Sequence, residues 1–199
     1  MCSYDDVERS LKSQTLRVCV VGIGRIGLPT ALFFAKSGLN TIGVDINENL
    51  VENINSGIYP LKDEPGIEEI FNNVITSKKF SATTKIEDAV PNSDLIVLSL
   101  PTPMDDNNIP EYSVLRSVAA QLSKSLAPNS LVIIESTVEP GFIEDEIVKT
   151  ILKSGRFESG ENLFIGVCPE NANPGEILQD FTNLPRLVGG INNHVAKLN

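Results

Sequence analysis

Short apolar runs alternate with longer amphipathic stretches along most of this chain of 199 residues. The runs are rich in valine, isoleucine and leucine, which is typical of strands buried on both faces of a parallel sheet. They predict strands at residues 17–21, 40–44, 80–83, 95–100, 131–135 and 163–167.

The stretches between these strands carry apolar residues at helical spacing. One such stripe lies in 67–75, and similar ones run through 115–126 and 143–152. Each stripe is typical of the side of a helix that faces a core. Strands that alternate with helices through short connections predict parallel pairing through right-handed crossovers. We therefore expect an α/β fold, a doubly wound parallel sheet of the Rossmann type.

The two parts of the chain before and after residue 15 differ in pattern. Residues 1–14 are polar without clear periodicity and predict a flexible N-terminal tail. Residues 15–190 have the length of one domain with a sizeable core. At this length a multi-domain enzyme would have to be incomplete.

The glycine-rich segment after the first predicted strand is the most specific motif. Gly22, Gly24 and Gly27 have the G-x-G-x-x-G spacing between an apolar strand and the start of a helix. In that context the motif predicts a dinucleotide site. Gly22 permits the tight turn, Gly24 lets the backbone approach a pyrophosphate, and Gly27 lets the helix pack closely on the sheet. The phosphates are expected at the helix N-terminus.

The residues around this motif favour NAD over NADP. The second predicted strand ends at Asp45, whose carboxylate can accept hydrogen bonds from the adenosine ribose hydroxyls. A side chain that recognises the 2'-phosphate of NADP is expected just after this strand, where Ile46 and Asn47 are not basic. Arg25 lies inside the glycine turn and is expected on the pyrophosphate side.

Polar residues follow three later strands, at the edge where ligands collect in such sheets. Thr102 follows the fourth strand, Thr137 the fifth and Glu170 the sixth. Two hydroxyls and a carboxylate near the nicotinamide half of a cofactor can perform acid–base chemistry and hold a water. Two alternatives stay open: Thr137 caps the helix that follows it, or Glu170 is a surface carboxylate in a turn.

Charge and hydropathy narrow the classes of binding partner that the chain is expected to have. The chain has 16 basic and 26 acidic residues, a net charge of -10, which disfavours nucleic acid or an anionic membrane as the main partner. No apolar run approaches the roughly 18 residues of a membrane span, and the start lacks a signal-peptide pattern. We expect a cytoplasmic protein.

Neither a disulfide framework nor a metal site is expected. Cys2, Cys19 and Cys168 are few and scattered, and His194 is the only histidine. Cys19 is predicted to be core. Cys168 ends a strand at the ligand edge, where a packed thiol is more common than a nucleophile. The acidic pair at 105–106 predicts a solvated loop rather than a cation site.

Several ordered motifs give the chain a specific resemblance. They are G-I-G-R-I-G-L-P-T at Gly22, V-D-I-N at Val44, G-I-Y-P-L-K-D-E-P-G-I-E-E-I at Gly57, P-T-P at Pro101, E-S-T-V-E-P-G at Glu135, C-P-E-N-A-N-P-G at Cys168 and L-V-G-G at Leu187. Over residues 16–190 the chain resembles the UDP-glucose/GDP-mannose dehydrogenase family. The form of the C-P-E motif most resembles the UDP-N-acetylmannosamine 6-dehydrogenase branch.

The resemblance implies a reaction and roles for residues. Such enzymes oxidise the C6 alcohol of a UDP-sugar to a carboxylate with two NAD per turnover, through a cysteine-bound thiohemiacetal and thioester. Thr137 would help hold the water and contact the cofactor, and Glu170 would assist proton transfer. Thr137 and Glu170 are therefore the predicted catalytic residues. The predicted cofactor-binding residues are Gly22, Gly24, Arg25, Ile26, Gly27, Asp45, Pro101, Thr102 and Thr137.

The chain departs from the family pattern in two ways. Asn171 stands where the branch usually has arginine, which weakens the assignment of the sugar. The nucleophilic cysteine, its partner lysine and most of the UDP-sugar site belong to a middle helix and a C-terminal domain expected beyond residue 199, as does most of the family's dimer interface. We expect residues 191–199 to start that linker helix, and the fragment to bind NAD without catalysing the reaction alone.

Three other functions stay open. A UDP-glucose 6-dehydrogenase would differ mainly in residues beyond this chain. A dehydrogenase of the 3-hydroxyisobutyrate or 6-phosphogluconate type would have signatures other than P-T-P and S-T-V-E-P-G after the fourth and fifth strands. A free-standing NAD-sensing module would have no evident need for the E-P-G loop at 64–66 or the edge at 168–175.

Overall fold

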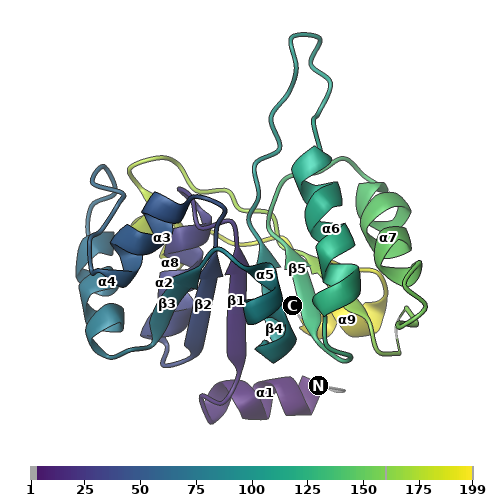
Figure 1. Cartoon of the computed structure of the whole chain (residues 1–199), viewed down its shortest axis with the longest axis horizontal. Coiled ribbons are helices and arrows are strands. Elements are labelled where there is room, and N and C mark those ends of the chain that lie inside the picture. Colours follow the sequence, from purple (N-terminus) through teal and green to yellow (C-terminus); the bar gives the residue numbers. More distant parts are fainter. Residues whose placement is uncertain (1–3, 160, 199) are drawn as a thin grey trace.

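The computed structural model describes residues 4–159 and 161–198. Within these residues, seven strands form one sheet in the order β3-β2-β1-β4-β5-β6-β7 (Figure 1). The first six are parallel, and β7 is antiparallel to β6. Their bounds are β1 Arg17–Val21, β2 Asn40–Val44, β3 Phe80–Thr83, β4 Leu95–Leu98, β5 Leu131–Ile134, β6 Phe164–Val167 and β7 Gly189–Gly190. The predicted doubly wound α/β fold is confirmed.

The last residues that we assigned to the fourth and fifth strands lie outside the sheet. β4 ends at Leu98 and β5 at Ile134, so that residues 99–100 and Glu135 leave the strands and line a cavity. Strand β7 was not predicted, because its two glycines carry no apolar pattern.

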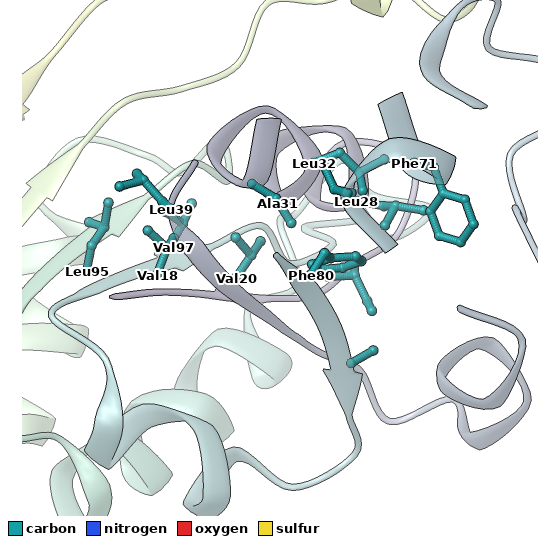
Figure 2. Packing of buried hydrophobic residues seen from close by; sticks show 14 of the residues in the cluster. Val18, Val20, Leu28, Ala31, Leu32, Leu39, Phe71, Phe80, Leu95 and Val97 are labelled. Carbon is teal, nitrogen blue, oxygen red and sulfur yellow. The ribbon is translucent and has the colours of Figure 1, made fainter. Parts of the chain in front are cut away.

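Both faces of the sheet are buried, which explains why its strands are almost wholly apolar. Val18 and Val20 of β1 point to one face, whereas Cys19 and Val21 point to the other. The first face packs mainly against helices α2 (Gly27–Lys36) and α4 (Ile67–Thr76), as Figure 2 shows for Leu28, Leu32 and Phe71.

The second face packs against helices that follow β3, β4 and β5. They are α5 (Ile86–Ala89), α6 (Ser113–Ser125), the π-helical turn η2 (Ile143–Val148) and its continuation α7 (Lys149–Leu152). The apolar stripes predicted at 67–75, 115–126 and 143–152 are all found on core-facing helices. The remaining elements are α3 (Glu48–Asn55), η1 (Val90–Asn92), α8 (Ile177–Asn183) and α9 (Asn193–Leu198).

The N-terminal segment differs from the flexible tail that we expected. Helix α1 (Tyr4–Lys12) lies beside the sheet at the end away from the long loop (Figure 1). Acidic residues occupy its first turn, Lys12 pairs with Glu8 at 2.6 Å, and Val7 is buried. The apolar side of this short helix consists of Val7 and Leu11 alone, and the segment resembles a tail in sequence because it is polar overall. Cys2 lies outside the described residues.

The connection from β4 to α6 projects far beyond the body of the molecule (Figure 1). Its tip is a turn in which Asp105 Oδ1 accepts hydrogen bonds from the backbone N–H groups of Asn107 and Ile109, both at 2.8 Å. The carboxylate of Asp105 is thus committed to the loop itself. Within 4–159 and 161–198, no group of three or more His, Cys, Asp or Glu is arranged to hold a metal ion.

The C-terminal residues form a short docked helix. Helix α9 lies in the stretch where we expected a linker helix, and Val195 is completely buried. A side chain on Gly190 would meet the backbone of Val195 and Ala196 at 2.4–2.8 Å, which explains the glycine there. In the described part of the chain, no helix has the length and apolarity required to cross a membrane.

Candidate cofactor site

A cavity of about 540 Å³ opens at the carboxyl ends of the parallel strands. Its walls come from the glycine turn after β1, the end of β2, the edges after β4 and β5, and helix α6. The lining residues are Val21, Gly22, Gly24, Arg25, Ile26, Val44, Asp45, Ile46, Thr84, Ile86, Ser99, Leu100, Pro101, Val114, Val118, Gln121, Glu135, Ser136, Thr137 and Glu170. This is the edge at which doubly wound sheets bind ligands.

The three glycines of the motif stand in different surroundings. A Cβ atom on Gly27 would lie 1.8 Å from the carbonyl oxygen of Gly22, so only glycine allows α2 to start this close to the turn. Gly22 has φ +88° and a Cβ there would meet Ser99 O at 2.4 Å. A Cβ on Gly24 would have no atom of the described chain within 4 Å. Gly24 therefore borders open space that a ligand can fill.

The N-terminus of α2 faces this space. Arg25 and Ile26, which precede Gly27, both line the cavity. The first N–H groups of a helix have no partner within the helix and carry partial positive charge. In α2, Leu28 N and Thr30 N donate to the carbonyl oxygens of Gly24 and Ile26, and Pro29 has no N–H. A pyrophosphate beside Gly24 would therefore meet the N–H groups of residues 24–27, at the end of the glycine turn.

Asp45 is oriented by the backbone on both sides. Its Oδ2 accepts a hydrogen bond from Ile23 N at 3.1 Å, and its Oδ1 accepts one from Asn47 N at 3.0 Å. A carboxylate oxygen has lone pairs for more than one donor, so these bonds leave capacity for a ribose diol. Ile46, next to it, is almost fully exposed at the cavity rim.

Arg25 is held by a loop that the sequence analysis did not link to it. Its Nη2 lies 2.6 Å from Asp63 Oδ2 and its Nη1 lies 3.0 Å from Glu64 Oε1. Both carboxylates belong to the D-E-P-G segment before α4. Arg25 thus belongs to the cavity lining while its guanidinium is paired with these acids.

Most of the predicted site residues meet at this cavity. Thr137 and Glu170 both line it, which brings the ends of β5 and β6 together as expected. Gly27 and Thr102 lie outside the lining, Gly27 because it packs against the turn. The predicted residues that line the cavity are Gly22, Gly24, Arg25, Ile26, Asp45, Pro101, Thr137 and Glu170.

The structure also bears on the alternatives for Thr137 and Glu170. Thr137 is exposed, and the helix after it begins only beyond Phe142, so Thr137 does not occupy the N-cap position. Glu170 is half-buried, and its Oε2 accepts a hydrogen bond from Ala172 N at 2.8 Å, as in a turn. The carboxylate of Glu170 thus combines a turn contact with a place in the cavity wall.

Ser136 and Glu135 line the cavity although we assigned no role to them. The Ser136 hydroxyl accepts a hydrogen bond from Leu100 N and donates one to Leu100 O, both at 2.8 Å, and so joins the edges after β4 and β5. Glu135 and Ser136 belong to the E-S-T-V motif, which the sequence shows. Their burial and their hydrogen-bond partners depend on the tertiary structure and could not be predicted from the motif.

Glu135 is a buried carboxylate at the centre of a polar network. It accepts hydrogen bonds from Thr30 Oγ1 at 3.0 and 3.1 Å and from Arg186 Nη2 at 3.0 Å, and its side chain is only 4% exposed. Burial raises the pKa of Glu135 above its usual range, and hydrogen bonds from Arg186, Ser99 and Thr30 oppose that rise.

The two described cysteines differ in environment. Cys19 is fully buried in β1, as predicted, and burial raises the pKa of its thiol to about 12. Cys168 is half-buried and lines a smaller cavity of about 310 Å³ on the other side of Glu135. Its carbonyl oxygen accepts a hydrogen bond from Arg186.

Comparison with known proteins covers almost the whole chain. Residues 16–198 match the model of the UDP-glucose/GDP-mannose dehydrogenase family, NAD binding domain. The UDP-N-acetyl-D-mannosamine dehydrogenase of Campylobacter jejuni is 34% identical over 193 residues, which cover 93% of this chain and 46% of that protein.

Two solved structures show the same fold. The UDP-D-ManNAc dehydrogenase of Pyrococcus horikoshii aligns with a TM-score of 0.86 at 31% identity, over 92% of this chain and 43% of that one. The NDP-N-acetyl-D-galactosaminuronic acid dehydrogenase of Methanosarcina mazei aligns with a TM-score of 0.85 at 28% identity, over 98% and 42%. This chain therefore spans less than half the length of these relatives.

Proposed function

Because this chain belongs to the UDP-glucose/GDP-mannose dehydrogenase family, as its NAD-binding domain, we propose that it is the cofactor-binding part of an NAD-dependent UDP-sugar 6-dehydrogenase. The proposed reaction oxidises the C6 alcohol of the sugar to a carboxylate with two NAD. The observation that carries the proposal is one continuous cavity, with the glycine turn and Asp45 at one part and Thr137 and Glu170 at another.

The chain's own residues divide the work along this cavity. Gly24 leaves room for the pyrophosphate, and Asp45, fixed by Ile23 N and Asn47 N, accepts hydrogen bonds from the ribose. NAD, when bound, accepts the hydride. Thr137 holds a water or contacts the nicotinamide half, and Glu170 takes or gives a proton beside it. Pro101 is proposed to complete the wall after β4, with Thr102 next to it outside the lining.

We propose UDP-N-acetylmannosamine as the sugar nucleotide, because relatives with that name match over most of this chain. The solved structure named as an NDP-N-acetyl-D-galactosaminuronic acid dehydrogenase supports only the broader class of nucleotide-sugar substrate. Asn171, in place of the usual arginine, donates from Nδ2 to Pro185 O at 3.2 Å and so braces the edge after β6. UDP-glucose is the second substrate to test.

Calorimetric titration with NAD and with NADP tests the cofactor part of this proposal. We expect NAD to bind more tightly than NADP, and Asp45→Asn to reduce the preference for NAD by about tenfold, or ~1.4 kcal/mol, because the ribose loses a charged acceptor. An unchanged ratio of the two affinities in Asp45→Asn would contradict the role given to this carboxylate.

An absorbance assay for NADH with UDP-N-acetylmannosamine, and separately with UDP-glucose, tests the catalytic part. The chain alone is expected to bind NAD and produce no NADH, because the proposed nucleophile lies outside it. NADH formation by this chain would mean that its own residues complete the reaction.

A further inference from the structure

The edge loop, residues 168–175, ends on a buried carboxylate. Gly175 N donates to both oxygens of Glu64, at 3.1 and 3.0 Å, and the Glu64 side chain is only 1% exposed. The same carboxylate accepts from Arg25 Nη1 at 3.0 Å, and Arg25 stands inside the glycine turn. One side chain therefore joins the edge loop to the turn that receives the phosphates.

The start of the edge loop is also connected to the glycine turn, through the helix α2 that follows the turn. Arg186 Nη2 donates to Cys168 O and to Glu135, both at 3.0 Å. Glu135 in turn accepts from Thr30 in α2, the helix that the glycine turn opens. Both ends of the edge loop are thus connected, through one buried carboxylate each, to the glycine turn and its helix.

From these contacts we infer that Glu64 is a positioning residue, which couples NAD binding at the glycine turn to the placement of the edge loop and hence of Glu170. This inference rests on the proposed function and adds to it a link between the cofactor end and the sugar end of the site. No catalytic step is assigned to Glu64 itself.

Separating Glu64 from Arg25 or from Gly175 would cost free energy. A buried carboxylate that loses a cationic or N–H partner is left without the interactions that offset its desolvation. Arg25, Glu64 and Gly175 are therefore expected to move together rather than apart. When a ligand fixes the glycine turn, it also fixes Arg25, and through Glu64 it restricts the edge loop.

Two substitutions separate this link from a general charge effect. Glu64→Gln keeps the shape and an oxygen acceptor for Gly175 N but removes the charge that holds Arg25. Asp63→Asn is the matched control, because Asp63 pairs with the same guanidinium at 2.6 Å but is 58% exposed. Exposed ion pairs contribute little.

Amide hydrogen exchange of the 199-residue chain, with and without saturating NAD, measures the coupling. In the wild type and in Asp63→Asn, NAD is expected to slow exchange at residues 22–28 and also at 171–178. In Glu64→Gln, protection at 22–28 is expected to remain at saturation, and the NAD-dependent protection at 171–178 is expected to be lost.

The outcomes are distinguishable. Protection at 22–28 without any at 171–178 in the wild type overturns this inference and leaves the proposed function intact. Full protection at 171–178 in Glu64→Gln also overturns it. Absence of protection at both segments in the wild type overturns the proposed cofactor site as well. The wild-type comparison needs no variant, so the test stands even where Glu64→Gln fails to fold.

Discussion

At the scale of single residues, glycines of one motif carry different constraints. Gly27 is required by the fold, because any Cβ atom there collides with the backbone of Gly22. Gly24 borders open space in the cavity. A motif that looks uniform in sequence thus separates into a structural and a ligand-facing position.

This difference predicts that alanine at Gly27 mainly lowers stability, whereas alanine at Gly24 mainly weakens NAD binding. Gly27→Ala is expected to lower the free energy of unfolding by about 3 kcal/mol, the upper end for overpacking, because backbone atoms cannot give way. Gly24→Ala is expected to change it by less than about 0.5 kcal/mol. It should nevertheless weaken NAD binding at least about tenfold. Urea unfolding and calorimetric titration of both variants check this, and equal stability loss in the two would contradict it.

Glu135 predicts a pH dependence of stability. Its pKa is raised in the folded state, so its contribution is fully present below the pKa of an unfolded glutamate and is lost as pH rises through the folded value. The free energy of unfolding of the wild type, relative to Glu135→Gln, should therefore fall as the pH rises above the ordinary pKa of a glutamate.

Urea unfolding at several pH values measures this difference, with Glu139→Gln, an exposed carboxylate on the same edge, as the matched control. A difference that grows with pH would mean that the ion pair with Arg186 outweighs burial.

At the scale of elements, helix α1 is attached to the fold through few side chains. Val7 is 7% exposed, whereas Leu11 on the same helix is 43% exposed. The helix lies at the end of the sheet away from the long loop (Figure 1). The cofactor cavity is at the opposite end, where its lining residues follow the carboxyl ends of the strands.

Val7→Ala is therefore expected to lower the free energy of unfolding by about 1–2 kcal/mol and to leave NAD affinity unchanged. Leu11→Ala, the control, should cost less than about 0.5 kcal/mol. Thermal unfolding and NAD titration of both variants test this. A loss of NAD affinity in Val7→Ala would show that α1 is coupled to the site.

The sequence predicted elements whose signal is local and periodic, and missed those that depend on tertiary contacts. The six parallel strands and the main helices follow from apolar runs and stripes, and the glycine motif located the cavity. By contrast, β7 consists of two glycines held by α9, and α1 has one buried valine. The bond from Gly175 to Glu64 joins residues that are 111 positions apart, which no local pattern reveals.

At the scale of the whole molecule, the reactivity of the Cys19 thiol measures whether the centre of the sheet opens. It lies in β1 between β2 and β4 and is fully buried. Burial raises the pKa of its thiol to about 12, so little reactive thiolate forms in the folded protein.

Iodoacetamide is thus expected to modify Cys168 in the native protein and Cys19 only after global unfolding. Mass spectrometry across a urea series measures both sites. Native-state labelling of Cys19 at the rate of Cys168 would mean that the sheet opens without unfolding as a whole.

The strand order has a consequence for how the chain can assemble during synthesis. β1 is made first and lies inside the sheet, β2 and β3 extend it on one side, and β4, β5 and β6 extend it on the other. Each new strand emerging from the ribosome finds its neighbour already present at an open edge. The sheet can therefore grow outward by successive addition, without inserting any strand between two that are already paired.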